Sequence, residues 1–403
     1  MDKKLYYQEK NEHLNQIKKL NICFLITSGR SGSIFLHSLL DGHPEILTIP
    51  ILFDSYAFWL ENHHLNNRVL FIENLIKNTN FSLLSERKNT KESGDFSLSK
   101  FDANLFRKNL LNIISETPQK PDDFFYCIYL AYALSRGINL EQIKIIVEHS
   151  HFYPYRVIEK QKNFPHSLFL HIIRNPKDSF YSYYKRYIQL NNGTILPEHW
   201  LYILESCVYG INDILKYDSE SFYKTILLEN LHTSPQNEIK ELAEFLKISI
   251  NPSLFESTLD GIPYIANSGV HQNTSGFSPE IIKSKYHQEF SKNDIAFIET
   301  ITQQLMRLKN YPFESEQLMS INSLIKYRFK SEKKMNHLGA LFYQYPKDIR
   351  DVAQKSILHK LLDQIMLLRF FVYFKVYQKY LKSIRSFWSK RTKIITDSLS
   401  GKN

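Results

Sequence analysis

The sequence predicts an α/β fold in three layers, with a central parallel sheet between two layers of helices and a helical basic extension at the C-terminus. Short apolar runs bounded by polar turn residues alternate along the chain with longer segments of helical periodicity. Strands that alternate with helices form parallel sheets with right-handed crossovers. The 403 residues can bury one large core, and their 43% hydrophobic and 23% charged content is ordinary for a globular protein.

Each expected element corresponds to one of these runs. We expect strands at residues 21–26, 143–147, 168–173 and 224–228. We expect helices at residues 33–40, 56–77, 105–115, 124–134, 176–188, 198–216, 237–246 and 293–308, with a polar loop at 82–99.

Cysteine usage and hydropathy predict a cytoplasmic protein. The three cysteines, Cys23, Cys127 and Cys207, are scattered, and an odd number without paired spacing fits a reducing compartment. Residues 1–20 lack the apolar stretch of a secretory signal, and no run reaches the ~18 apolar residues of a membrane-spanning helix. Any contact with a membrane is therefore expected to be peripheral.

The net charge of +10 is concentrated in the C-terminal tail. Residues 355–403 hold eleven Lys and Arg against two Asp, a net +9, which leaves the rest of the chain near neutral. In this tail Arg369 and Lys375 interrupt apolar runs, a pattern typical of a basic amphipathic helix that lies on an anionic membrane. The alternative is a helix packed on the domain with a solvated basic face. No recognised module accompanies the charge, so nucleic acid is not an expected partner.

The turn after the first strand, residues 27–34, is a candidate anion site. Its backbone N–H groups and the positive end of the following helix can surround a phosphate, and its two glycines allow close approach. Arg30 adds a fixed, forked positive charge. An ordinary nucleotide-hydrolysing P-loop would need Gly-Lys-Ser/Thr here, which is missing. The candidate contacts are Ser28, Gly29, Arg30, Ser31, Gly32, Ser33 and Ile34.

This turn resembles the 5′-phosphosulfate loop of sulfotransferases, commonly Arg/Lys-Ser-Gly-Ser/Thr. Its continuation at residues 35–46 is similar to the bacterial and tyrosylprotein branches of that family. The resemblance implies a P-loop-like fold and the donor 3′-phosphoadenosine 5′-phosphosulfate (PAPS), with adenosine 3′,5′-bisphosphate (PAP) as product and no metal. Residues 47–52 lack the carboxylate that serves as base in the tyrosylprotein branch, which argues against a glutamate base there.

A second strand-to-helix turn, residues 172–184, resembles the family's 3′-phosphate motif, Arg-Asn/Asp-Pro-x-Asp followed by a Ser. The resemblance implies that Arg174 and Ser182 hold the 3′-phosphate. Arg174 is expected at the carboxyl end of a strand, where open α/β sheets bind ligands. Asp178 is expected to fix the turn or cap the helix rather than touch an anion.

The proposed base is a histidine. Cytosolic sulfotransferases carry Lys-x-His after a strand, and residues 149–151 occupy that place, with His149 at the Lys and His151 at the catalytic His. A neutral imidazole can accept the proton of an acceptor hydroxyl. Glu148 is either a base or an orienting partner, and His37 either packs or lines the acceptor site.

The resemblance extends from about residue 21 to 309 and leaves the acceptor open. In the place of the family's loop over the 3′-phosphate lie residues 267–276, where His271 and Asn273 are weak candidates beside an ordinary surface loop. The resulting division is an N-terminal extension at 1–20, a catalytic domain at 21–315 and a helical basic extension at 316–403. The rival functions are an ATP-dependent kinase with a degenerate loop and a non-catalytic, membrane-associated nucleotide-binding scaffold.

Overall fold

The chain forms two compact units in a computed structural model. The first comprises Met1–Asn175 and Tyr209–Ser284, and the second comprises Pro176–Val208 and Lys285–Asn403. The structure describes residues 11–27, 29–77, 101–150, 157–190, 210–211, 213–267 and 272–320. The expected loop at 82–99, most of the expected helix at 198–216 and the basic tail at 355–403 lie outside these ranges.

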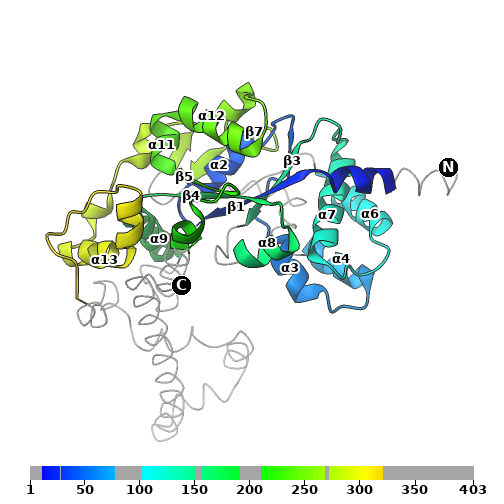
Figure 1. The fold of residues 1–403 in the computed structure, drawn as a ribbon, viewed down its shortest axis with the longest axis horizontal. Helices are drawn as coiled ribbons and strands as arrows, with labels where there is room; N and C mark the ends of the chain where they lie inside the picture. Colours follow the sequence, from blue (N-terminus) through cyan, green and yellow to red (C-terminus); the bar gives the residue numbers. More distant parts are fainter. Residues whose placement is uncertain are drawn as a thin grey trace, which may run out of the picture. The chain divides into compact units, whose positions relative to one another are not determined.

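A five-stranded parallel sheet forms the centre of the first unit (Figure 1), which confirms the predicted fold class. Its strands lie in the order β2-β3-β1-β4-β5. Their bounds are β1 (Asn21–Thr27), β2 (Ile46–Thr48), β3 (Ile145–Ser150), β4 (Leu168–Ile173) and β5 (Tyr223–Leu227). All four pairings are parallel. The predicted strands are therefore found within a few residues, while the three-residue β2 was not predicted.

Helices lie on both faces of the sheet (Figure 1), and successive side chains of each strand point alternately to one face and the other. On one face Cys23 and Leu25 of β1 join a core with α2 (Ser33–Leu40), α11 (Leu228–Thr233) and α12 (Pro235–Leu246). On the other face Phe24 packs edge-on against Phe125 of α7 (Pro121–Arg136), with ring centroids 5.9 Å apart. Phe164, just after α8 (Val157–Asn163), lies 5.2 Å from Phe24 on that same face.

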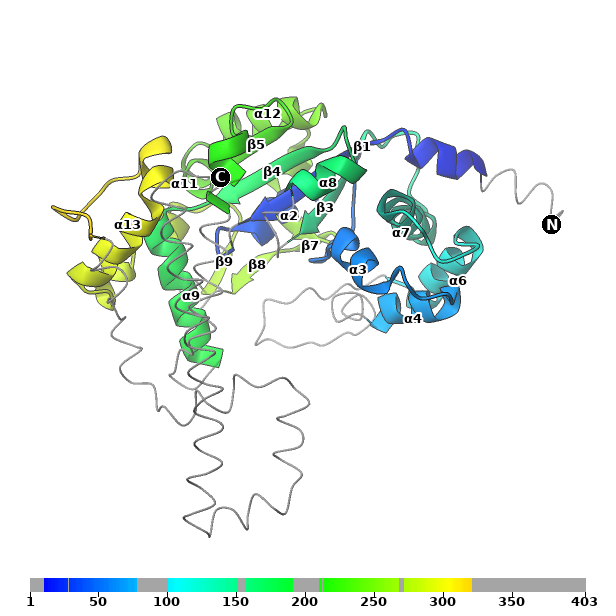
Figure 2. The same cartoon turned by 60° about the horizontal axis from the view of Figure 1, so that its bottom comes forward.

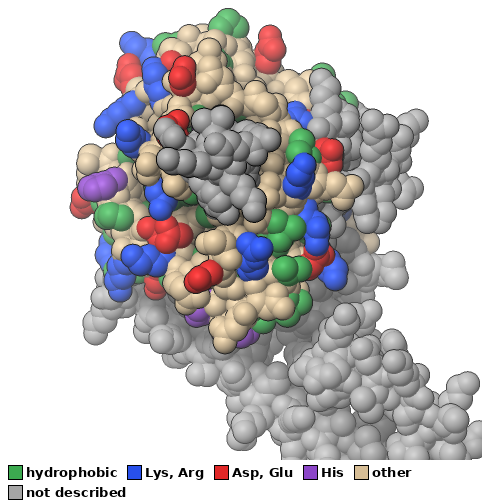
Figure 3. Space-filling model, turned by 90° about the vertical axis from the view of Figure 1, so that its right-hand side faces the viewer, with side chains coloured by type: hydrophobic (Ala, Val, Ile, Leu, Met, Phe, Trp, Pro, Cys, Tyr) green, Lys and Arg blue, Asp and Glu red, His purple; other side chains and the backbone are tan. Residues whose placement is uncertain are grey.

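Helices α3 (Ser55–Asn62), α4 (Arg68–Lys77) and α6 (Ala103–Ile113) gather around α7 in both ribbon views (Figures 1 and 2). The prediction of one helix over 56–77 was wrong, because the chain breaks between α3 and α4. The Asn67 side chain accepts hydrogen bonds from the backbone N–H groups of Val69 and Leu70, at 3.0 and 3.1 Å, and so caps a new helix. On the face drawn in Figure 3, basic and acidic side chains are interspersed over the described atoms.

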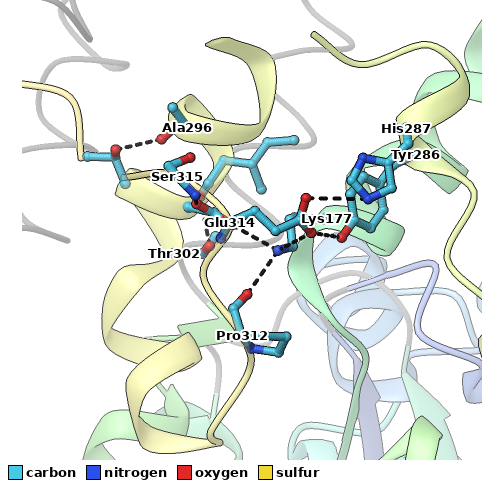
Figure 4. Close-up of polar contacts among 11 residues, drawn as sticks. Lys177, Tyr286, His287, Ala296, Thr302, Pro312, Glu314 and Ser315 are labelled. Atoms are coloured by element: carbon cyan, nitrogen blue, oxygen red, sulfur yellow. Dashed lines mark hydrogen bonds and ion pairs between the residues drawn. The ribbon is translucent and has the colours of Figure 1, made fainter. Parts of the chain in front are cut away.

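Buried Lys177 anchors the second unit. It lies in the first turn of α9 (Pro176–Leu190), and its ammonium donates to Glu299 of α13 (Lys292–Leu308) at 2.8 Å. It also donates to Glu314 and to the carbonyl of Pro312, each at 2.9 Å (Figure 4). Lys177 and Glu299 are fully buried, and paired burial of this kind is the condition under which a charge is tolerated in a core.

The described residues also include several short elements after α12. They are the antiparallel pairs β6 (Thr258–Leu259) with β7 (Ile262–Pro263) and β8 (Ile265–Asn267) with β9 (Gln272–Ser275), and the 3₁₀ helices η2 (Pro252–Phe255), η3 (Pro279–Ile282) and η4 (Tyr286–Gln288). Within the described ranges, no helix combines the length and apolar character that a bilayer crossing requires.

Candidate active site

The turn between β1 and α2 has the backbone geometry of an anion cradle. Gly29, Arg30 and Gly32 all have left-handed backbones, with φ of 81°, 52° and 84°. The hydroxyl of Thr27 accepts from the Gly29 N–H at 3.0 Å, and the Ser31 hydroxyl donates to the Gly29 carbonyl at 3.0 Å. Backbone turns that mix right- and left-handed residues form concave sets of N–H groups that bind anions.

Gly32 is required by space as well as by its backbone angle. A Cβ at this position would lie 2.5 Å from Cδ1 of Leu228, the first residue of α11. Gly32 is also the N-cap of α2 and has no side chain, so no cap side chain occupies the N–H groups of the first turn. Ser33 and Ile34 supply the first N–H groups of that helix. The helix start is therefore open to an anionic ligand.

The second predicted cluster follows the neighbouring strand. β4 pairs directly with β1, with Thr27 opposite Ile172, so Arg174 follows β4 at the same carboxyl edge as the β1–α2 turn. Arg174 is 7% exposed and donates from Nη2 to the Ile281 carbonyl at 2.9 Å. The backbone N–H of Asn175 donates to Glu229 at 2.7 Å. Both contacts fix this turn beside α11 and η3.

The strand order places a topological switch point between β1 and β4 at this edge. The connection from β1 leads to β2 on one side of the sheet, and the connection from β4 leads to β5 on the other. In open α/β sheets, ligands bind at such a switch point, outside the carboxyl ends of the strands. Arg30 lies close enough to Tyr264 that its charge opposes the rise in pKa, to about 12, that burial gives the tyrosine.

Two histidines meet on the α2 face of the sheet. His149 lies in β3, opposite Leu25 of β1, and His37 lies on α2. Their Nδ1 atoms are 3.1 Å apart, and both side chains are almost completely buried. His37 Nε2 lies 2.8 Å from the hydroxyl of Thr48, which donates to the Val147 carbonyl at 2.9 Å. Burial lowers the pKa of His37 to about 4, so its ring is neutral at physiological pH.

Glu148 faces the opposite side of the sheet. Its carboxylate lies 3.4 Å from the ammonium of Lys160 on α8, which also donates to Ser150 at 2.7 Å. Burial raises the pKa of Glu148 to about 7, with the charge of Lys160 opposing that rise. The backbone N–H of Ser55 donates to the same carboxylate at 3.3 Å. Glu148 therefore holds α3 and α8 on the sheet, on the face away from His37.

The remaining predicted residues are placed less completely. Ser28, His151 and His271 lie outside the described residues, and Asn273 is described only as backbone in β9. Ser182 is buried in α9 of the second unit, and Asp178 lies in the first turn of that helix. Their assigned roles stay predictions.

Sequence reasoning missed Thr48, Lys160 and Leu228. Thr48 belongs to a three-residue strand too short to give a periodic pattern. Lys160 is 1% exposed, although lysine is rarely buried, and its carboxylate and hydroxyl partners together with the ring of Phe24 below its ammonium explain its position. Leu228 is an ordinary apolar residue in the sequence. Its side chain lies against Gly32 because β5, which leads into it, pairs with β4.

Comparison with known proteins agrees with this geometry. A model of the sulfotransferase domain matches residues 21–310. No curated protein matches the sequence significantly.

Several solved structures match this chain at low sequence identity. One is the sulfotransferase domain from the Synechococcus PCC 7002 olefin synthase, at 15% identity over 73% of this chain and 96% of that chain, with a TM-score of 0.48. Another is the sulfotransferase domain from the curacin biosynthetic pathway, at 15% identity over 73% and 99%, with a TM-score of 0.41. A third is mouse sulfotransferase SULT7A1 complexed with PAP, at 14% identity over 75% and 94%, with a TM-score of 0.38. Since the domain model covers most of the sequence and the site residues lie within it, the chain belongs to the sulfotransferase family.

Proposed function

We propose that this sulfotransferase takes its sulfuryl group from PAPS and that the β1–α2 turn and Arg174 hold the two phosphorylated ends of the donor. The observation that carries the proposal is the anion cradle around Gly32, beside an arginine that follows the adjacent strand. The left-handed residues of this cradle, Gly29, Arg30 and Gly32, turn backbone N–H groups toward a common centre, an arrangement that binds phosphate. The matched family favours a sulfuryl donor over the ATP of the kinase alternative.

Sulfuryl transfer needs in-line geometry, charge stabilisation and a base, as phosphoryl transfer does. In the proposed step a histidine at 149 or 151 takes the proton of the acceptor hydroxyl or amine as its oxygen or nitrogen bonds to sulfur. The bond between sulfur and the bridging phosphate oxygen breaks, and its electron pair stays on that oxygen. Arg30 and the N–H groups of the turn stabilise the new negative charge, and Arg174 holds the 3′-phosphate.

The acceptor and the cellular location belong to this proposal as well. A basic tail at 355–403 favours a cytoplasmic enzyme that lies at an anionic membrane surface and sulfates a glycan, a lipid-linked acceptor or a small molecule. Flotation with anionic and with neutral vesicles tests the tail: the full chain should float only with anionic vesicles. A chain ending at residue 354 should stay at the bottom in both cases.

Transfer of ³⁵S-labelled sulfate to panels of glycans, lipids, peptides and phenols tests the activity. We expect label on at least one acceptor class and release of PAP. The non-catalytic scaffold predicts PAP binding without label on any acceptor, and this result would overturn the proposal.

A further inference from the structure

In the hydrogen bond between His37 and His149, one ring must be the donor and the other the acceptor. Their Nδ1 atoms are 3.1 Å apart, and the two rings are nearly perpendicular, at 88°. A hydrogen bond between two ring nitrogens requires a hydrogen on one and a lone pair on the other. Which histidine donates therefore depends on the other hydrogen bond that His37 makes.

Thr48 decides this direction. Its hydroxyl has a single hydrogen, which it donates to the Val147 carbonyl at 2.9 Å. Towards His37 Nε2, 2.8 Å away, the same oxygen can then only accept. His37 Nε2 therefore carries a hydrogen. Because burial keeps His37 neutral, its Nδ1 carries a lone pair and accepts the hydrogen bond from His149 Nδ1.

This hydrogen bond also sets the protonation state of Nε2, the other ring nitrogen of His149. A neutral imidazole with its hydrogen on Nδ1 has its lone pair on Nε2, and the bond made by one ring nitrogen sets the state of the other. We propose that Thr48 and His37 are positioning residues that hold His149 as the Nδ1–H tautomer, so that Nε2 is the proton acceptor in sulfuryl transfer. This inference rests on the proposed function and concerns His149, one of its two candidate bases.

The hydrogen-bonded chain Thr48–His37–His149, which we call the relay, is built on the sheet. Thr48 and Val147 are partners in the β2–β3 register, and His149 lies two residues beyond Val147 on the same face. His37 is buried on α2, which packs on that face. The relay is thus built from a strand pair and one helix rather than from loops. When Nε2 takes up a proton, His149 keeps its Nδ1–H bond to His37, so the ring does not need to reorient.

Nitrogen NMR of the full chain, labelled with ¹⁵N-histidine and saturated with PAP, tests the relay at about pH 8, where a histidine of ordinary pKa is neutral. The His149 signals are assigned by their loss in His149→Asn. We expect the wild-type protein to show a protonated Nδ1 and an unprotonated Nε2. A protonated Nε2 on neutral His149 would overturn the inference, and this readout depends on no acceptor.

Matched variants separate positioning from packing. His37→Asn keeps an acceptor oxygen at the place of Nδ1 and should retain the His149 tautomer, whereas His37→Leu removes the acceptor and should mix the tautomers. Thr48→Ser and Thr48→Val form the same kind of pair. With an acceptor from the ³⁵S panel, His37→Leu should lower kcat on the order of 100-fold at unchanged affinity for PAP. An unchanged tautomer in both His37→Leu and Thr48→Val contradicts the relay, while absence of transfer by the wild-type chain contradicts the proposed function alone.

Discussion

Replacing Gly32 by alanine tests the anion cradle through its backbone. The new Cβ would lie 2.5, 3.2 and 3.3 Å from Cδ1, Cδ2 and Cγ of Leu228. Leu228 is 2% exposed and lies within the core of the α2 face. A left-handed backbone costs a residue with a Cβ roughly 1–2 kcal/mol, and overpacking of a core costs about 1–3 kcal/mol. Gly32→Ala should therefore lower the free energy of unfolding by about 2–5 kcal/mol.

Gly137→Ala is the matched control. Gly137 ends α7 with φ of 64°, also left-handed, but its Cβ would meet no atom within 4 Å. The free energy of unfolding of this variant should fall only by the roughly 1–2 kcal/mol that a left-handed backbone costs a residue with a Cβ. The difference between the two variants therefore measures the overlap with Leu228. Urea unfolding followed by circular dichroism gives both values.

A double-mutant cycle isolates the contact itself. Leu228→Ala removes all three overlapping atoms, so Gly32→Ala should cost about 1–3 kcal/mol less in that background than in the wild type. Gly32→Ala should also weaken PAP binding, which Gly137→Ala should leave unchanged. The reasoning is refuted if Gly32→Ala costs no more than Gly137→Ala, or if Leu228→Ala does not reduce its cost.

Two buried charges give further predictions. Lys177→Met leaves the buried carboxylate of Glu299 without a countercharge, although the backbone N–H groups of Glu314 and Ser315 still donate to it, so the free energy of unfolding should fall by ~3–5 kcal/mol. Lys185→Met on the same helix breaks a partly exposed pair with Glu289 and should cost less than about 1 kcal/mol in the same urea assay. The pKa of Glu148, about 7 when folded, lies above its ordinary value of 4.5, so the folded protein keeps a proton that the unfolded chain has lost. Wild-type stability should fall relative to Glu148→Gln by about 3 kcal/mol as pH rises from 4.5 to 7, and parallel pH profiles would contradict this.

Local patterns predicted much of the sheet and its helices. The bounds of α2 agree with prediction because the turn before it and the Asp-Gly-His-Pro stretch after it mark both ends. β4 agrees because its apolar run is flanked by polar residues. The break between α3 and α4 falls in the polar stretch 61–68, where Leu65 is the single apolar residue, and the Asn67 side chain caps the new helix. The sequence therefore held a signal for this break that the prediction of one helix overlooked.

Contacts across the sheet could not be predicted in the same way. His37 was expected to pack or to line the acceptor site, but its contact with His149 joins residues that lie 112 positions apart. That contact depends on β3 lying between β1 and β2, an order that local periodicity does not encode. The family motifs identified Arg30 and Arg174 in the sequence. That β1 and β4 are neighbours in the sheet, however, is known only from the fold.

Isothermal titration calorimetry tests the central claim that the β1–α2 turn and Arg174 bind an adenosine bisphosphate. PAP and ATP are each titrated into the wild-type protein and into Arg174→Ala. PAP should bind at one site and ATP far more weakly. Arg174→Ala should lose affinity for PAP by roughly 1.5–3 kcal/mol, as expected for a lost charged hydrogen bond. Equal binding of ATP, or unchanged PAP affinity in Arg174→Ala, would contradict the account.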